Sequence, residues 1–97
     1  MTLKETIAMV EAFHNAFGIE NRHKPTAELS KAQQELRYRL MAEENDEYLE
    51  AVKNNDLVEI ADALGDQLYI LCGTILKHGL QDKIAAVFKE IQRSNMS

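Results

Sequence analysis

Hydrophobic residues recur at helical spacing along most of this chain. Near the N-terminus the apolar positions fall three or four residues apart, and they are Ile7, Val10, Phe13 and Phe17. Residues at this spacing share one face of an α-helix. Thr2 precedes the pattern with Glu5 three positions later, which is the arrangement of a capping box, and Gly18 follows it. We therefore predict a first helix that begins at Thr2 and ends at Gly18.

A loop and a longer second helix are predicted next. Residues 19–28 include Pro25 and lack a regular apolar period, so we expect them to form a loop. Thr26 or Ser30 is the candidate N-cap of the second helix, because a hydroxyl at that position can accept a bond from the first helical turn. The helix is expected to run to about Lys53, where the sequence KNND interrupts the pattern.

The rest of the chain predicts two more helices. Asp56, with Glu59 three residues later, is the candidate N-cap of a third helix that ends just before Gly79. A fourth helix is expected over about 82–93, with apolar residues at Ile84, Val87, Phe88 and Ile91. No segment alternates with the period of a β-strand. We predict an all-α fold, a four-helix bundle-type domain that occupies residues 1–97.

The second helix carries carboxylates inside its apolar stripe. At about 100° per residue, one face of this helix gathers four apolar side chains, which are Leu29, Leu36, Leu40 and Ala51. Glu44 and Glu47 fall within or at the border of that face, and Glu43 lies one step outside it. An outward, solvated acidic face is one interpretation. The other is that the acids are buried beside cations, since unpaired carboxylates cost several kcal/mol each to bury.

The third helix repeats this combination of an apolar stripe with acids. Its regularly spaced apolar residues, expected to form the core, are Leu57, Ala61, Leu64, Leu68, Leu71 and Ile75. Glu59, Asp62 and Asp66 cluster on the opposite side, and Tyr69 continues along that side. Glu59 is equally suited to closing the capping box with Asp56. The apolar C-terminal half indicates a helix buried on most sides, so the acids are expected to face a cavity or a subunit interface.

Composition narrows the chemistry. The net charge of −5 argues against a general nucleic-acid binder or a protein attracted to anionic membranes. No apolar run is long enough to span a membrane, and the N-terminus has acids where a signal peptide would have its apolar region. Cys72 is the only cysteine, so it has no internal partner for a disulfide. A reduced, cytoplasmic compartment is expected, with Cys72 as a small core residue.

Two acidic helix faces that meet would form an oxygen-rich pocket. Such a pocket suits hard divalent cations, Mg²⁺ or Mn²⁺, which prefer oxygen ligands. The sequence has no cysteine cluster or paired histidines for zinc, no EF-hand loop and no glycine-rich phosphate loop. A metal site of this kind is suited to binding phosphates and activating water.

The acidic segments resemble the motif of a known family. EENDE at residues 43–47 and EIAD at residues 59–62 are similar to the two-part signature of the all-α nucleoside triphosphate pyrophosphohydrolases. This group includes MazG-like enzymes and phosphoribosyl-ATP pyrophosphohydrolase. DALGDQLYILCGTIL resembles the apolar helix that carries a metal-binding Asp in the group, and VEAFHNAFG resembles the opening of one small bacterial branch.

The resemblance implies a metal-dependent hydrolase. Such an enzyme cleaves the bond between the α- and β-phosphates of a nucleoside triphosphate, giving a monophosphate and pyrophosphate with Mg²⁺ or Mn²⁺. The metal ligands it implies are Glu44, Glu47, Glu59, Asp62 and Asp66. Glu43, at the edge of the cluster, is the candidate for orienting or deprotonating the attacking water. An alternative alignment of GDQLY makes Asp66 the principal ligand of the third helix and leaves Ala63 where the motif has Glu.

Other residues and functions remain open at this stage. Phe13, Phe17 and Tyr69 are candidates for nucleotide binding, although core packing explains the two phenylalanines as well. His14 is expected at the surface. Lys31, Arg37 and Arg39 could reach phosphates across a subunit interface, but surface pairing with Glu35 and Glu43 is the favoured interpretation. The apolar third helix needs more cover than the chain supplies, so a homo-oligomer, a dimer or tetramer, is expected. Phosphoribosyl-ATP hydrolysis and a non-catalytic metal-binding or interaction module are the alternative functions.

Overall fold

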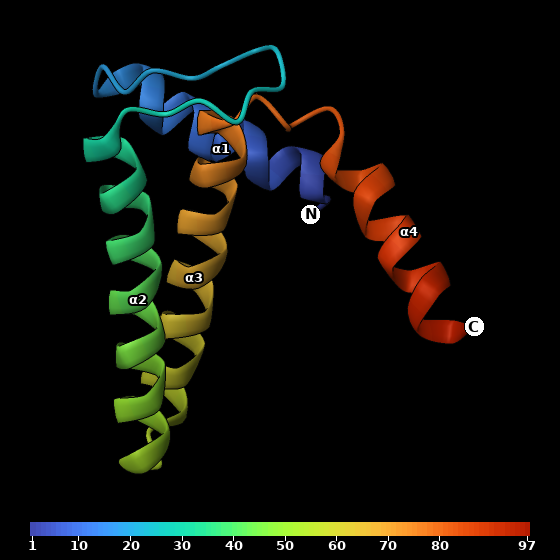
Figure 1. Ribbon diagram of the computed structural model, residues 1–97. Coiled ribbons are helices and arrows are strands. Elements are labelled where there is room, and N and C mark those ends of the chain that lie inside the picture. Colours follow the sequence, from blue (N-terminus) through green and yellow to red (C-terminus); the bar gives the residue numbers. More distant parts are fainter.

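The computed structural model describes residues 1–97 and is entirely helical (Figure 1). Its four helices are α1 (Leu3–Ala16), α2 (Lys31–Lys53), α3 (Leu57–Lys77) and α4 (Ile84–Met96). The all-α class and the number of helices predicted from the hydrophobic pattern are confirmed. None of the helices combines the length and the hydrophobicity that crossing a membrane requires.

The helix ends follow the capping residues of the sequence. Thr2 and Glu5 form the predicted capping box, in which the Thr2 hydroxyl accepts from the Glu5 backbone N–H at 3.1 Å. Ser30, rather than Thr26, caps α2 and accepts from the backbone N–H of Gln33 at 3.2 Å. Asp56 caps α3. Each side-chain oxygen satisfies a backbone donor that the first turn leaves free, which fixes where these helices begin.

Helices α2 and α3 form the central pair of the fold. They run antiparallel and side by side, joined by the tight turn at Asn54–Asp56, in which Asn55 has a positive φ of 50°. Helix α1 packs across the C-terminal half of α3, at the upper end of the pair in Figure 1. Helix α4 points away from the other three. The antiparallel pair brings the acidic segments of the two helices to the same level.

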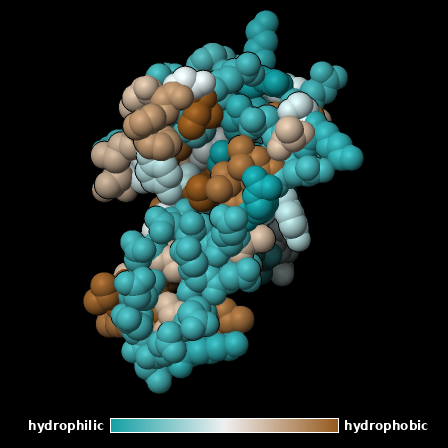
Figure 2. Space-filling view, turned by 90° about the vertical axis from the view of Figure 1, so that its left-hand side faces the viewer, coloured by the Kyte–Doolittle hydropathy of each residue, from teal (hydrophilic) through white to brown (hydrophobic).

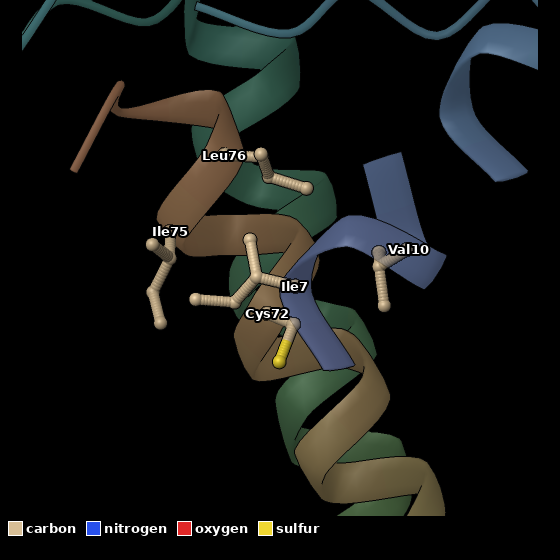
Figure 3. Packing of buried hydrophobic residues seen from close by; sticks show 5 residues of the cluster. All are labelled: Ile7, Val10, Cys72, Ile75 and Leu76. Atoms are coloured by element: carbon tan, nitrogen blue, oxygen red, sulfur yellow. The ribbon is translucent and has the colours of Figure 1, made fainter. Parts of the chain in front are cut away.

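A small hydrophobic core lies where α1 crosses α3 (Figure 3). It consists of Ile7, Val10, Cys72, Ile75 and Leu76. Leu80, from the connection after α3, and Ile84, the first residue of α4, pack against its edge. Cys72 is 1% exposed, as expected of a small core residue. This core fixes the position of α1 on α3.

Most of the stripe predicted as the core of α3 is exposed in the single chain. Leu64, Leu68 and Leu71 are each nearly half exposed, and Leu57 is 77% exposed. Only Ile75 of the predicted stripe is buried, so this prediction was wrong for the isolated chain. The reason is geometric: α1 and α2 cover two sides of α3, and α4 does not fold back over the remaining side.

A long connection crosses the C-terminal end of α3. The backbone N–H groups of Arg22 and Thr26 donate to the carbonyls of Leu76 and His78, both at 2.9 Å. Gly79 has a φ of 64°, and any Cβ there would overlap the backbone of Lys24. Carbonyls at the end of a helix lack donors within the helix, and the connection supplies a backbone N–H donor to each of these two carbonyls. Residues 17–30 therefore form a fixed cover over this end of the molecule.

Candidate functional site

Facing side chains of α2 and α3 form an acidic pocket of about 600 Å³. Its acidic lining residues are Glu44, Glu47, Glu50, Asp56, Glu59, Asp62 and Asp66. The structure thus brings together all five residues predicted as metal ligands, from two separate segments of the chain. No lysine, arginine or histidine lines the pocket. The surface in Figure 2, seen from the α2 side, is correspondingly hydrophilic over much of its lower half.

Three of the acids are especially close. Carboxylate oxygens of Glu44, Glu47 and Asp66 lie within 4.8 Å of one another, so these residues form a group that could hold one ion. Asp62 and Glu59 line the same pocket outside this cluster. Of the two aspartates that the sequence left undecided, Asp66 is therefore the one nearest to the acids of α2.

Glu59 is only partly engaged in capping α3. Its backbone N–H donates to the Asp56 carboxylate at 3.1 Å, but its side chain does not complete the reciprocal half of a capping box. At the start of α1, by contrast, both halves are present between Thr2 and Glu5. The Glu59 carboxylate consequently remains free to act within the acidic pocket.

The electrostatics of the cluster are unfavourable without a cation. The pKa of Glu44 is raised to about 7, first by its partial burial, then by its hydrogen bond with Glu47 and the negative charges around it. The pKa of Asp66 is also raised, by burial and by the charges of Asp62 and Glu47. The Oε2 atom of Glu44 is buried without any hydrogen-bond partner. Buried polar atoms are normally satisfied, so this oxygen needs a ligand.

These residues fit a hard divalent cation. The three ligand atoms of the cluster are carboxylate oxygens, the ligand type that Mg²⁺ and Mn²⁺ prefer. A bound cation would supply both the missing partner of Glu44 Oε2 and the positive charge that the lining lacks. Zinc is a poor match because neither histidine nor cysteine lies in the pocket.

Glu43 lies beside the acidic pocket rather than in its lining. It is exposed, and its carboxylate oxygen is 4.0 Å from Nε of Arg39 one turn earlier on α2. This is the surface pairing expected for Arg39. The proposed action of Glu43 on an attacking water stays a prediction.

A second cavity, of about 670 Å³, lies at the end of the α2–α3 pair that α1 crosses. We call it the upper cavity, and its lining includes Phe13, His14, Arg37, Leu40, Tyr69 and Lys77. The Phe13 and Tyr69 rings meet edge to face with their centroids 5.7 Å apart. Phe17 packs on Phe13 at 4.8 Å but is 70% exposed and does not line the cavity. Two of the three candidate nucleotide-binding aromatics therefore line the cavity.

The two sites adjoin along the helix pair. Leu40 of the upper cavity is four residues before Glu44, and Tyr69 is three residues after Asp66. Residues three or four apart lie one above the other on a helix. The acidic pocket and the upper cavity thus occupy successive turns of the same α2–α3 groove.

Three basic side chains at the upper cavity are buried, and for two of them this contradicts the prediction. His14 is 3% exposed, Arg37 is 7% exposed and Lys77 is 4% exposed. His14 was expected at the surface and Arg37 in a surface ion pair, and both expectations were wrong. The spacing of Arg37 indicated that it faces inward, because it lies three residues before Leu40 and seven before Glu44 on the same face of α2. His14 is drawn inward because its Nδ1 hydrogen-bonds Asn21 Oδ1 at 2.6 Å.

Comparison with known proteins identifies the family. A family model described as phosphoribosyl-ATP pyrophosphohydrolase matches residues 10–95. The chain belongs to this family. The match spans both the acidic pocket and the upper cavity, and it confirms the family group indicated by EENDE and EIAD. Searches for curated relatives and for similar solved structures found no match.

Membership of the phosphoribosyl-ATP pyrophosphohydrolase family establishes the type of enzyme. The chain is a hydrolase of the nucleotide pyrophosphohydrolase type. In the α2–α3 groove, a dense carboxylate cluster adjoins a cavity with aromatic and basic lining. The groove is accordingly the candidate active site.

Proposed function

We propose that this chain is a Mg²⁺-dependent pyrophosphohydrolase that cleaves the anhydride between the α- and β-phosphates of a nucleotide. The observation that carries the proposal is the cluster of Glu44, Glu47 and Asp66, with carboxylate oxygens within 4.8 Å of one another. The unpartnered Oε2 atom of Glu44 within that cluster supports a cation as its ligand. Family membership supports the reaction class.

Phosphoribosyl-ATP is the substrate that we propose first. The description of the matching family names it, which favours it over the ordinary nucleoside triphosphate that the sequence led us to expect first. Both compounds carry the same triphosphate, so the acidic pocket would treat them alike. Any preference between them must come from groups that bind outside that pocket.

The carboxylates would hold the metal ion from both helices. Glu44 and Glu47 would act from α2 and Asp66 from α3, with Asp62 and Glu59 available as further oxygen donors in the same pocket. A bound Mg²⁺ or Mn²⁺ supplies positive charge that neutralises the phosphates and polarises the phosphorus under attack. The carboxylates also exclude a bare triphosphate, because like charges repel.

Hydrolysis also requires an oriented water molecule. Its oxygen forms a new bond to phosphorus, the anhydride P–O bond breaks, and the water gives up a proton. Glu43 is our candidate for positioning that water or accepting its proton, because it adjoins the cluster and is accessible to solvent. The products are a nucleoside monophosphate, or phosphoribosyl-AMP, and pyrophosphate.

The aromatic pair at the upper cavity suits a nucleotide base. Phe13 and Tyr69 line the cavity one turn from the acidic cluster, so a base could lie against them with its phosphates at the metal. Aromatic rings pack favourably against the flat face of a base. Phe17, at 70% exposure, would contribute only from outside the cavity.

A homo-oligomer is part of the proposal. Leu64, Leu68 and Leu71 leave an apolar stripe on α3, and Val87, Phe88 and Ile91 leave another on α4. Contiguous exposed apolar surface of this kind normally marks an interface between proteins. A second copy of the chain is the partner that we propose, in a dimer or a tetramer.

The proposed function is tested by pyrophosphate release. Phosphoribosyl-ATP and a panel of ribo- and deoxynucleoside triphosphates would be incubated with the protein and Mg²⁺ or Mn²⁺, beside a Glu47→Gln variant. We expect release that requires the metal and that the variant loses. Metal-dependent stabilisation without release from any compound would contradict catalysis and favour a non-catalytic metal-binding module.

A further inference from the structure

The upper cavity has a basic lining in an acidic protein. The chain as a whole carries a net charge of −5, yet the ionised residues around this cavity are three cations, Arg22, Arg37 and Lys77, and one carboxylate, Glu20. Glu20 is already paired with Arg22, whose Nε is 2.8 Å from its carboxylate. Arg37 and Lys77 form no ion pair with any carboxylate in the chain.

Both of these cations are held in fixed positions. Arg37 Nη2 donates to the Ile70 carbonyl at 3.0 Å, and its Nε donates to Thr74 Oγ1 at 3.1 Å. Lys77 Nζ donates to the Glu20 carbonyl at 2.9 Å. A lysine ammonium has three donors and a guanidinium five, so each group keeps N–H donors beyond these bonds. Two positioned cations with spare donors are the elements of an anion site.

Burial of these cations is costly without a counter-ion. Each side chain is more than nine-tenths buried, and desolvation lowers the pKa of both Arg37 and Lys77. Neutral acceptors satisfy hydrogen bonds but supply no balancing charge, and Glu20, whose charge acts on Lys77, is already paired with Arg22. An anionic ligand in the cavity would supply that charge.

The position of Lys77 excludes the triphosphate itself as its anion. Lys77 is eleven residues from Asp66 along α3, which is about 16 Å at the α-helical rise of roughly 1.5 Å per residue. That distance exceeds the length of a triphosphate chain whose metal-bound part lies at Asp66. An anion bound at Lys77 must therefore belong to the opposite end of the substrate, beyond its base, and Arg37 lines the same cavity.

We propose that Arg37 and Lys77 bind a phosphate monoester at the end of the substrate remote from the cleaved anhydride. This inference rests on the proposed function, since it assigns the second anionic end of that substrate. A substrate with phosphates at both ends would span the groove, with its triphosphate at the acidic pocket and its base beside Phe13 and Tyr69. A nucleoside triphosphate has no second phosphate and leaves the two cations unpaired.

Direct binding of a monophosphate tests the inference without catalysis. Ribose 5-phosphate would be titrated into the full-length protein in EDTA by calorimetry, with ribose and inorganic phosphate as comparison ligands. We expect ribose 5-phosphate to bind and ribose not to bind. Tighter binding of inorganic phosphate than of ribose 5-phosphate would overturn a monoester site and indicate a site for the free ion.

Matched variants locate the site. Arg37→Gln is compared with Arg39→Gln, an exposed arginine on the same helix, and Lys77→Gln with Lys4→Gln, an exposed lysine on α1. Removing the charge of Arg37 or of Lys77 should weaken ribose 5-phosphate binding by about tenfold or more, because hydrogen bonds from a cation to phosphate are strong. The exposed controls should stay within about twofold of wild type. Equal affinities in all four variants would overturn the assignment.

A measurement on the unaltered protein covers variants that fail to fold. In NMR spectra of the wild-type chain, ribose 5-phosphate should shift the amide signals of Gly73, Thr74 and Lys77 and leave those of Glu44 and Glu47 unchanged. Shifts confined to the acidic pocket, or none at concentrations at which calorimetry detects binding, would contradict the inference.

The outcomes separate this inference from the proposed function. Ribose 5-phosphate binding without pyrophosphate release from any substrate would overturn the function and keep the anion site. Pyrophosphate release with no ribose 5-phosphate binding, and with the same KM for phosphoribosyl-ATP in Arg37→Gln and Arg39→Gln, would overturn the anion site alone.

Discussion

The guanidinium group of Arg37 on α2 lies directly against Gly73 on α3. A Cβ atom at Gly73 would be 2.7 Å from Arg37 Nη2 and 3.1 Å from Nε2 of His14. Both neighbours are buried and hydrogen-bonded, so neither can withdraw without losing a partner. The absence of a side chain at Gly73 is therefore what allows an arginine and a histidine to enter the groove.

Gly73→Ala should destabilise the fold. We expect a loss of about 1–3 kcal/mol, because the new methyl group displaces Arg37 and His14 from their hydrogen bonds. Gly65→Ala on the same helix is the control, since no atom lies within 4 Å of its added Cβ. That change should be neutral, or stabilising by up to about 1 kcal/mol, because alanine favours a helix. Urea unfolding of both variants checks the prediction, and equal midpoints would contradict it.

Divalent cations should stabilise the protein through the acidic pocket. We expect Mg²⁺ or Mn²⁺ to raise the Tm, because the ion binds the folded cluster and not the unfolded chain. Glu44→Gln and Asp66→Asn should lose most of this increase, whereas Glu35→Gln, an exposed change elsewhere on α2, should keep it. Thermal unfolding with and without metal provides the measurement. A metal effect of the same size in all three variants would place the ion elsewhere.

The metal-free protein should lose stability as the pH rises from about 5 to 7.5. The pKa of Glu44 is raised from 4.5 to about 7, so the folded state holds a proton that the unfolded state has released. Stability falls wherever the folded state binds more protons. After discounting for solvent screening, we expect about 1 kcal/mol, or roughly 4–8 °C in Tm.

Glu44→Gln serves as the control for this pH effect. Burial lowers the pKa of His14, which makes stability rise with pH and opposes the effect of Glu44. The difference between wild type and Glu44→Gln in EDTA isolates the glutamate, since His14 is common to both. Parallel curves of Tm against pH would show that the Glu44 carboxylate is not perturbed.

Glu43→Gln should separate metal binding from turnover. Loss of a group that orients or deprotonates water lowers kcat by about 10²–10⁴-fold. Because Glu43 lies outside the lining of the acidic pocket, the metal-induced rise in Tm should persist. Steady-state pyrophosphate release and thermal unfolding of the same preparation measure both properties. Full turnover in the variant would remove Glu43 from the mechanism.

Leu71→Glu should disrupt self-association. Leu71 lies on the exposed apolar stripe of α3 and is 49% exposed, so a charge there would be buried in a dimer interface but solvated in a monomer. Light scattering after size exclusion should show wild type as a dimer or tetramer and the variant as a smaller species at micromolar concentration. Ala32→Glu, an exposed change on α2, is the control. A monomeric wild type would refute the proposed oligomer.

Local signals predicted where the helices lie and that acidic side chains of two helices face one pocket. Caps at Thr2 and Asp56 act within a few residues, so the sequence alone specifies where α1 and α3 begin. The spacing of Glu44 and Glu47 on α2 placed them on the side that faces α3, and the antiparallel pairing then brought Asp66 beside them. Helical periodicity carries this information because it fixes the direction of each side chain about its own axis.

Burial of basic residues and the true core could not be predicted in the same way. Burial of Lys77 depends on the carbonyl of Glu20, which is supplied by a connection without regular structure. The apolar stripe of Leu64, Leu68 and Leu71 was expected to be buried because periodicity gives the direction of a face but not what covers it. Both outcomes depend on how the helices cross, which no single segment encodes.

The separation of α4 from the other helices has a consequence for folding. An isolated helix of about 12–15 residues is marginal in water, and α4 has only 13 residues, without a buried side chain. Apart from Ile84, its apolar residues must find a partner before the helix can persist. The helical content of this protein should therefore vary with its concentration: dilution would unwind α4 and leave the hairpin of α2 and α3 intact.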